Sequence, residues 1–474
     1  MTGPERQREL GQPSEPGQAR EPGQPGQPSE PGHGRMHAAG RMRAALTAGP
    51  LANRDFRLYS AGQLTSTVGD YCYAVALPWL ILSTHGGPVL LGTVLACYGV
   101  PRTVLIPVGG ILADKIGPRA IMLWSDAARC LLVAVLALIA ARHLDSLADL
   151  GPIAALIGAG EGLFLPASFA IMPTLLPPDH LQAGNAVSSA MIQVGSLAGP
   201  VLGGLLVTTA GPAPAFAVDA ASFAISATAL ALIRARGAPA PVPAAQPEPA
   251  GTLPAEPAEV ASAQPGPAGG VWSLLRHSRM LQTILLVAVV ANLTFGGTFE
   301  VALPALAHAR FGPTGYGALI ACFGAGAVVG TLAAARGIGV RRPALVACGG
   351  YLIAAASVSL VPFLGGLAGS AAAILVFGAV NGFGNIVLIT LLQQWAPAHL
   401  LGRVMSLVML AGIGSFPASV AISGVLVHRL GPSPFFPVAG VVLAITILGA
   451  LTQREMRDFG SARSPEAVLS ADPA

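Results

Sequence analysis

Apolar runs of about 20 residues recur along the chain from Leu58 to Leu451, and short polar breaks separate them. A helix needs a run of about this length to cross the ~30 Å of hydrocarbon in a bilayer. Charged residues make up 10% of the chain and the mean hydropathy is +0.66, whereas about 25% of the residues of an ordinary soluble domain are charged. The sequence therefore predicts an all-α membrane protein.

Twelve runs are predicted as transmembrane helices, and a Pro-, Ala- and Gly-rich linker at 237–270 divides them into two groups of six. We expect two six-helix halves around a central cavity, at 54–236 and 271–454, with a head at 1–53 and a tail at 455–474. Head and linker are expected to be disordered. The head lacks the pattern of a signal peptide, so we expect it to be retained. The predicted spans are 57–83, 88–112, 119–141, 151–175, 183–208, 213–234, 281–307, 315–336, 343–363, 368–394, 402–428 and 433–452.

The basic residues predict the orientation, because Lys and Arg near membrane helices are retained on the cytoplasmic side. With the N-terminus inside, 21 of the 26 Lys and Arg residues lie in cytoplasmic segments, and only Arg142, Arg310 and Arg429 lie in external loops. Both termini are therefore expected in the cytoplasm, and the net charge of +4 reflects topology and not nucleic-acid binding. The use of 25 Arg against one Lys suggests a high-GC bacterial gene, and hence the plasma membrane.

Two short matches indicate an internal repeat. "GILADKIG" at 110–117 aligns with "GTLAAARG" at 330–337, an offset of 220, and "PDHLQAG" at 178–184 aligns with "PAHLLGR" at 397–403, an offset of 219. Two related six-helix halves are the layout of transporters that bind substrate near the membrane midplane, between halves that rock.

Two further motifs resemble signatures of the major facilitator superfamily, and in particular of its drug-efflux and metabolite-exporter branch. "GGILADKIGPR" resembles G-x-L-A-D-[RK]-x-G-[RK]-[RK], and "GSLAGPVLGG" matches the antiporter signature G-x-x-x-G-P-x-x-G-G at every fixed position. "FRLYSAGQLTSTVGD" and "FAVDAASF" are also similar to that branch. The resemblance extends from Arg54 to about Arg454, and Pro118 departs from it where a basic residue is usual. The first signature is kept at Gly110, Asp114, Lys115, Gly117 and Arg119.

Asp114 is predicted at the cytoplasmic mouth just before the third span, where a helix N-terminus stabilises a carboxylate by roughly 0.3–1 kcal/mol. The resemblance implies that this motif latches the two halves together on the cytoplasmic side in the outward-open state. The alternative is a solvated turn in which Lys115 serves topology alone.

The antiporter motif places small residues along one helix. Gly195, Gly199 and Gly203 are spaced four apart and form a stripe on which another helix can pack closely in lipid. Pro200 removes a backbone donor and is expected to bend the helix there. A packing face alone does not call for the added Pro200 and Gly204. The resemblance implies that this helix packs near the central interface and prevents uncoupled leak.

Ionisable groups inside the membrane are costly and by default mark a pathway or a proton site. Lys115 is the only lysine and lies outside any phosphate-binding loop, so uphill transport would use an ion gradient. All nine histidines lie in tails, loops or span ends, which leaves carboxylates as proton carriers. For each candidate carboxylate, the alternative is a structural role as a hydrogen-bond partner or as a counter-ion for Arg102. The candidates are Asp70, Glu161, Asp219 and Glu300.

Other polar residues fall inside the predicted spans. Arg102 near mid-depth forms either a buried salt bridge or a substrate contact. Asp126 and Arg129 are three residues apart and can meet on one helical face, which favours an intrahelical pair over a substrate site. The five cysteines occur singly, so no metal or cofactor is expected. Candidates for the polar lining of the cavity are Gln63, Gln193, Asn292, Asn381 and Asn385.

These observations favour a secondary active exporter that exchanges protons for a small amphipathic organic compound, such as a drug, an antibiotic or a siderophore-like metabolite. We expect a functional monomer whose partners are its substrate, protons and the bilayer. One alternative is an ion-coupled symporter that imports a small nutrient, and another is a non-transporting membrane sensor or scaffold. An enzyme is not expected, because the sequence shows neither a nucleophile motif nor paired catalytic carboxylates.

Overall fold

The structure is a computed structural model that describes residues 49–83, 86–142, 146–234, 275–276, 278–336, 342–396 and 400–458. Within these residues every regular element is a helix. The predicted linker lies outside the described residues, as do the predicted head up to residue 48 and the predicted tail from residue 459. The division into head, halves, linker and tail therefore stays a prediction at those places.

The first half is built from a short 3-10 turn and seven α-helices. Several helices begin with proline in the first turn, where its fixed φ fits and its missing N–H is not needed. The elements are η1 (Pro50–Ala52), α2 (Arg54–Ser83), α3 (Gly87–Ile116), α4 (Pro118–Ala141), α5 (Leu147–Ala170), α6 (Met172–Leu175), α7 (Pro178–Ala210) and α8 (Pro212–Leu232).

The second half differs from a row of straight spans in two places. The predicted seventh span contains a π-helical turn, and the predicted eleventh is divided at Ser415. The elements are α10 (Arg279–Gly297), η2 (Thr298–Ala302), α11 (Leu303–Arg310), α12 (Gly312–Ala335), α13 (Pro343–Leu360), α14 (Leu367–Trp395), α15 (Leu401–Gly414), α16 (Phe416–Leu430), α17 (Pro432–Thr452) and α18 (Arg454–Asp458).

Length and hydropathy test the predicted spans. Within the described part of the chain, ten helices are long and apolar enough to cross a membrane, and Ala344–Leu360 is a shorter apolar helix. α2 has 30 residues but is not among the ten. Its sequence includes Asp70 and many hydroxyl side chains, which lower its hydropathy. The described residues thus agree with ten of the twelve predicted spans, and the first and ninth stay predictions.

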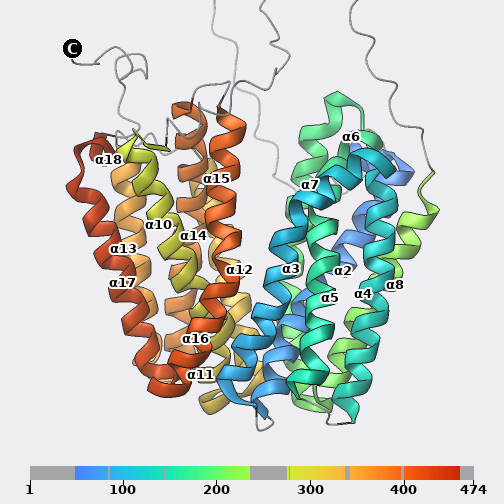
Figure 1. The fold of residues 1–474 in the computed structure, drawn as a ribbon, viewed down its shortest axis with the longest axis horizontal. Helices are drawn as coiled ribbons and strands as arrows, with labels where there is room; N and C mark the ends of the chain where they lie inside the picture. The colour runs from blue at the N-terminus through green and yellow to red at the C-terminus, as the bar shows by residue number, and fades with distance from the viewer. Residues whose placement is uncertain are drawn as a thin grey trace, which may run out of the picture.

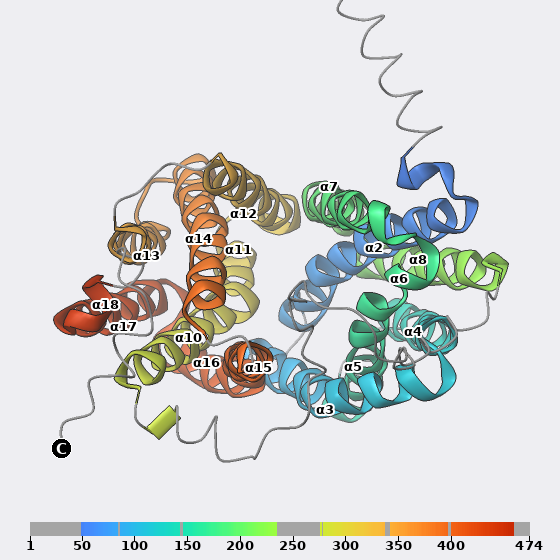
Figure 2. The same ribbon diagram turned by 90° about the horizontal axis from the view of Figure 1, so that it is seen from above.

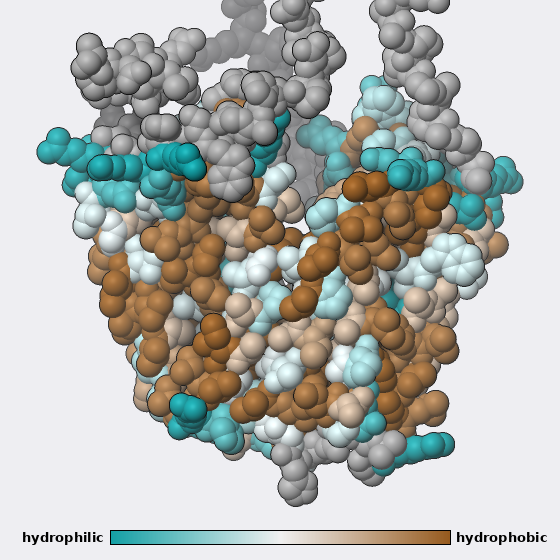
Figure 3. Space-filling view, in the orientation of Figure 1, coloured by the Kyte–Doolittle hydropathy of each residue, from teal (hydrophilic) through white to brown (hydrophobic). Residues whose placement is uncertain are grey.

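The two halves lie side by side, α2–α8 in one and α10–α18 in the other (Figure 1). From above, α7 faces α12, and α3 faces α15 and α16 (Figure 2). The halves meet at the lower end of Figure 1 and diverge toward the upper end, where α6 and α18 lie. Figure 3 shows apolar side chains over the middle of the molecule and a hollow between the halves at the upper edge. We call the upper end the α6 end and the lower end the closed end.

The two most extensive helix contacts between the halves, of α7 with α12 and of α3 with α16, begin with the same local structure. α3 opens with the Gly-Pro pair 87–88 and α12 with the pair 312–313, and the two glycines have φ of 61° and 72°. Such positive φ values are readily adopted by glycine. A Cβ added to Gly424 of α16 would stand 2.7 Å from the carbonyl oxygen of Pro88. A Cβ added to Gly204 of α7 would stand 2.8 Å from the carbonyl oxygen of Pro313. Equivalent helices therefore meet in the same way, which agrees with the predicted repeat.

Side chains complete the contact at the closed end. The hydroxyl oxygens of Thr208 and Thr314 lie 2.6 Å apart in a hydrogen bond across the halves. The rings of Trp79 and His308, from α2 and α11, have centroids 4.7 Å apart. The halves are thus joined on the side away from the α6 end.

Candidate functional site

The glycines of the antiporter motif allow close contact of α7 with two different helices, α2 and α12. Gly195, Gly199 and Gly203 face α2, and a Cβ on Gly199 would stand 2.5 Å from the Cβ of Tyr71. The predicted stripe therefore packs within the first half. Gly204 instead faces the start of α12, so the motif also holds the two halves together at the closed end.

Asp70 lies in the middle of α2 and its side chain is exposed. It interacts electrostatically with Arg129, Glu161, Asp126 and Arg102, which belong to α3, α4 and α5. A mid-helix carboxylate among charged groups of three other helices faces the interior of the bundle. The exposure of Asp70 therefore marks an internal space that solvent reaches, and not a lipid-facing surface.

Arg102 and Glu161 form a salt bridge between α3 and α5. The distance from Arg102 Nη2 to Glu161 Oε1 is 3.0 Å, and the two side chains are 24% and 27% exposed. The hydroxyl of Tyr98 donates a hydrogen bond to Glu161 Oε2. Arg102 Nε is buried and has no hydrogen-bond partner. Of the two interpretations of Arg102, the structure shows the salt bridge, and its buried free donor leaves Arg102 incompletely satisfied.

Tyr98 is a site residue that was not predicted from the sequence. Tyr98 and Arg102 are four residues apart, so they share one face of α3. The Arg102 guanidinium carbon lies 5.7 Å from the centre of the Tyr98 ring. The spacing of four residues between Tyr98 and an arginine inside a predicted span could have identified Tyr98 from the sequence.

Asp126 and Arg129 form the expected pair on α4, and both are buried. Arg129 Nη2 lies 2.6 Å from Asp126 Oδ1, and the hydroxyl of Ser226 on α8 donates to Asp126 Oδ2 over 2.6 Å. The guanidinium carbon of Arg129 lies 4.5 Å from the ring centre of Phe164 and 4.3 Å from that of Phe223, as in cation–π contacts. This charge pair is enclosed by protein and connects α4, α5 and α8.

Asp219 lies near this group but is enclosed. Its side chain is buried on α8, and the hydroxyl of Ser222 lies 3.4 Å from Oδ1. Gly69 of α2 packs directly on it, since a Cβ there would stand 2.5 Å from Asp219 Oδ1. Asp219 interacts electrostatically with Asp70. Its packing fits the structural alternative better than an accessible proton site.

Glu300 is the one carboxylate candidate from the second half. It is half-buried on the π-helical turn η2, which packs against α3. Glu300 interacts electrostatically with Arg102, although no described residue forms a hydrogen bond or an ion pair with it. Short π-helical turns inside α-helices occur frequently at functional sites. The structure therefore brings Asp70, Glu161 and Glu300 into one electrostatic group around Arg102.

The residues of the first signature lie apart from this group, at the α6 end. Asp114 and Lys115 are exposed, and the described residues offer Asp114 no ion pair. Gly117 has a φ of 89° and forms the turn between α3 and α4, while Gly110 faces Pro166 of α5. Arg119 donates to two carbonyls at the end of α8, Leu230 O at 2.7 Å and Ala231 O at 2.8 Å. Because the halves diverge here, the latch interpretation of Asp114 stays a prediction.

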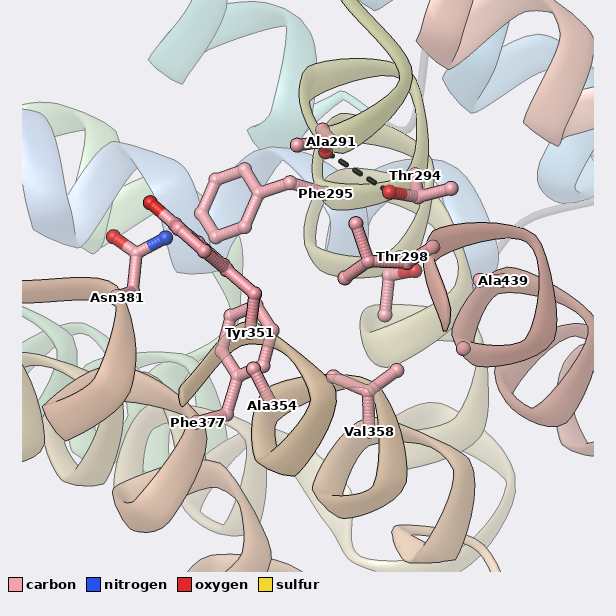
Figure 4. Close-up of a pocket in the computed structure, with 12 residues that line it drawn as sticks. Ala291, Thr294, Phe295, Thr298, Tyr351, Ala354, Val358, Phe377, Asn381 and Ala439 are labelled. Atoms are coloured by element: carbon pink, nitrogen blue, oxygen red, sulfur yellow. Dashed lines mark hydrogen bonds between the residues drawn. The ribbon is translucent and has the colours of Figure 1, made fainter. Parts of the chain in front are cut away.

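The second half contains a small, mostly apolar cavity between α10, α13, α14 and α17 (Figure 4). Phe295, Tyr351 and Phe377 line it together with Asn381. The rings of Phe295 and Phe377 are stacked, with centroids 6.0 Å apart. Phe299 joins the same aromatic cluster, 5.1 Å from Phe377. The lining is thus mostly apolar, with three aromatic rings and no charged side chain among its twelve residues.

The other polar lining candidates do not gather at one place. Asn292 donates from Nδ2 to the carbonyl of Ala288 and faces Gly412 of α15. Gln63 and Gln193 are half-buried, and Asn385 is exposed. Among the described residues no group of three or more His, Cys, Asp and Glu side chains could hold a metal ion.

A bundle of membrane helices in two repeated halves, with charged groups between them, is the architecture of a secondary transporter. The chain belongs to the Major Facilitator Superfamily, whose family model matches residues 59–419. This confirms the family resemblance of the sequence motifs.

Relatives and solved structures agree with this assignment. The chain is 26% identical to the uncharacterized MFS-type transporter YfiS of Bacillus subtilis (strain 168), over 82% of this chain and 91% of YfiS. It is 27% identical to the multidrug efflux pump Tap of Mycolicibacterium fortuitum, over 85% of this chain and 96% of Tap. A POT family transporter has a similar fold, with a TM-score of 0.65, 14% identity, and coverage of 84% of this chain and 96% of that one. The protein is therefore a multi-pass membrane transporter with relatives named as multidrug efflux pumps.

Proposed function

We propose that the protein exports amphipathic organic cations in exchange for protons. The observation that carries this proposal is the excess of carboxylates over cations: Asp70, Glu161, Glu300 and Asp126 interact with two arginines, Arg102 and Arg129, and Arg129 is already paired with Asp126. A proton and a cationic substrate compete for such carboxylates, and this competition is the basis of exchange. The aromatic cluster of the second half suits the apolar part of the same substrate.

The salt bridge gives each carboxylate a different role in this proposal. Arg102 neutralises Glu161 when no substrate is bound. When Glu161 binds a proton or a substrate cation instead, its salt bridge with Arg102 breaks. Asp70 is exposed without an ion pair among the described residues, so it is the first group that an entering cation meets. Glu300 extends the negative charge to the second half, so that binding involves both moving bodies.

The orientation and location follow the distribution of Lys and Arg. We propose that the α6 end faces the cytoplasm, so that the described conformation is open inward, and that the protein lies in the plasma membrane as a functional monomer. Support comes from the exposed Lys115 and the helix-capping Arg119 at the α6 end, because flanking basic residues are retained in the cytoplasm.

Proteoliposomes test the proposal directly. The full chain is reconstituted with a pH gradient across the membrane, and proton flux is recorded after addition of a lipophilic cation such as tetraphenylphosphonium. We expect substrate-triggered flux in the parent and in Asp179→Asn, an exposed control carboxylate on α7. We expect no proton flux in Glu161→Gln or Asp70→Asn, because each variant loses a carboxylate that both the proton and the substrate cation bind. Cation binding without any proton flux in the parent would rule out proton exchange.

A further inference from the structure

We propose that a pocket at the α6 end, between the start of α2 and the end of α8, binds the headgroup of a phospholipid that carries both a phosphate and a protonated amine. The pocket has a volume of about 350 Å³ and is lined by Asn53, Arg54, Asp55 and Arg234. It lies apart from the carboxylates of the transport site, which occupy the middle of their helices. The proposal therefore concerns a second binding site.

The inner wall of the pocket holds a carboxylate in place. Asn53 Nδ2 donates to the carbonyl of Leu175 over 2.6 Å, and Asn53 Oδ1 accepts from the backbone N–H of Asp55 over 2.9 Å. Asp55 is only 6% exposed, and its Oδ1 has no hydrogen-bond partner. Buried polar atoms are nearly always paired, and an unpaired one costs stability. Asp55 Oδ1 thus calls for a donor that the described protein does not supply.

The outer wall of the pocket carries two positive charges. Arg54 and Arg234 are exposed, and neither forms an ion pair or a hydrogen bond with a described residue. Arg57, the next arginine along α2, is already engaged with the carbonyls of Leu51 and Ala52. Guanidinium groups bind phosphate oxygens with parallel hydrogen bonds. Two free arginines beside an unpaired carboxylate match a phosphate with an attached ammonium group.

The position of the pocket favours a lipid as the source of this group. Figure 2 shows α8 on the side of the first half away from the second half. In a membrane, this outer side of the bundle would face lipid. The pocket lies where α2 begins and α8 ends, and with both helices spanning the bilayer we place it at the level of the lipid headgroups. Basic pockets between transmembrane helices on the cytoplasmic side are known to bind lipid headgroups. A membrane phospholipid with an amine headgroup therefore reaches the site from the side.

Native mass spectrometry of the full chain tests this site with three lipids of identical acyl chains: phosphatidylethanolamine, phosphatidylcholine and phosphatidylglycerol. We expect one tightly retained phosphatidylethanolamine, bound at least about fivefold more tightly than either other lipid, since phosphatidylcholine has no N–H donor and phosphatidylglycerol has no cation. Equal retention of all three lipids would overturn the proposal.

Variants separate the two walls of the pocket. R54A/R234A should lose the retained lipid, R54K/R234K should keep most of it, and Asp55→Asn should keep binding but lose the preference for the amine. The matched control R336A/R342A removes two exposed arginines from the second half and should retain the lipid. Unchanged retention in R54A/R234A, with an unfolding temperature equal to that of the parent, would overturn the proposal. Retention of water-soluble phosphoethanolamine as tight as that of the lipid would overturn the lipid assignment.

Discussion

The two halves share one helical plan but have different interiors. Every buried carboxylate or guanidinium among the described residues lies in the first half, at Asp55, Asp126, Arg129 and Asp219, whereas the buried polar side chains of the second half that are neither Tyr nor Cys are Ser and Thr. In the second half, phenylalanine rings stack beside a small cavity instead. A repeated fold has thus been divided into a charged half and an aromatic half. This difference shows that the internal repeat determines where the helices lie, whereas the side chains that fill the interior can differ between the two halves.

The largest expected effect is a loss of stability when a buried charge is removed from the first half. Arg129→Ala should destabilise the protein by about 3–5 kcal/mol, because it leaves Asp126 buried with an uncompensated charge. The unfolding temperature of the purified protein in detergent measures this, with the exposed Arg142→Ala as control. Replacing Asp126 and Arg129 together by apolar residues should recover part of the loss. An unfolding temperature of Arg129→Ala equal to the control's would show that the first half does not depend on its buried charges.

The next largest effect concerns the boundary between the halves. A Cβ on Gly204 would stand 2.8 Å from the carbonyl oxygen of Pro313, so Gly204→Ala should push α7 away from α12. In a chain freed of its five cysteines, the pair Thr208→Cys and Thr314→Cys should form a disulfide readily. Adding Gly204→Ala should lower the yield several-fold. An unchanged yield would mean that the close approach of these helices is not required.

A smaller effect would sharpen the role of the aromatic half. Phe295→Leu keeps an apolar side chain but removes the ring, and it should raise the KM of an aromatic lipophilic cation about three- to tenfold, since ring contacts contribute about 0.5–1.5 kcal/mol. The number of protons exchanged per substrate should stay the same. Phe311→Leu, outside the ring cluster, is the control. A changed proton ratio with an unchanged KM would place proton coupling in the second half and contradict the division.

The smallest effect on stability is expected at the α6 end. Asp114 is exposed and the described residues offer it no ion pair, so Asp114→Asn should change the free energy of unfolding by no more than about 0.5 kcal/mol. Transport should nevertheless slow several-fold if the latch predicted from the family motif forms in another conformation. Transport at the parent rate would favour the solvated-turn alternative.

The helices of both halves were predictable because apolar runs of bilayer length have few other outcomes. The helical pair Asp126–Arg129 was predictable too, since it depends only on local spacing. The break at Ser415 and the π-helical turn at Glu300 were not predicted, although each is followed by a proline that lacks a backbone N–H, Pro417 and Pro304 respectively. Sequence alone could not show that Gly199 faces α2 while Gly204 faces α12, because this depends on how helices distant in the chain pack. A single sequence gives periodicity along a helix but not the identity of the neighbour.

The partners of the buried pair on α4 have a consequence for how the protein is made. Ser226, Phe164 and Phe223 enclose Asp126 and Arg129, and Arg119 holds the last carbonyls of α8. All of these residues precede residue 235, so the ribosome has synthesised every group that neutralises these charges before the second half begins. During insertion into the membrane, the first half can complete its own interior without waiting for the rest of the chain.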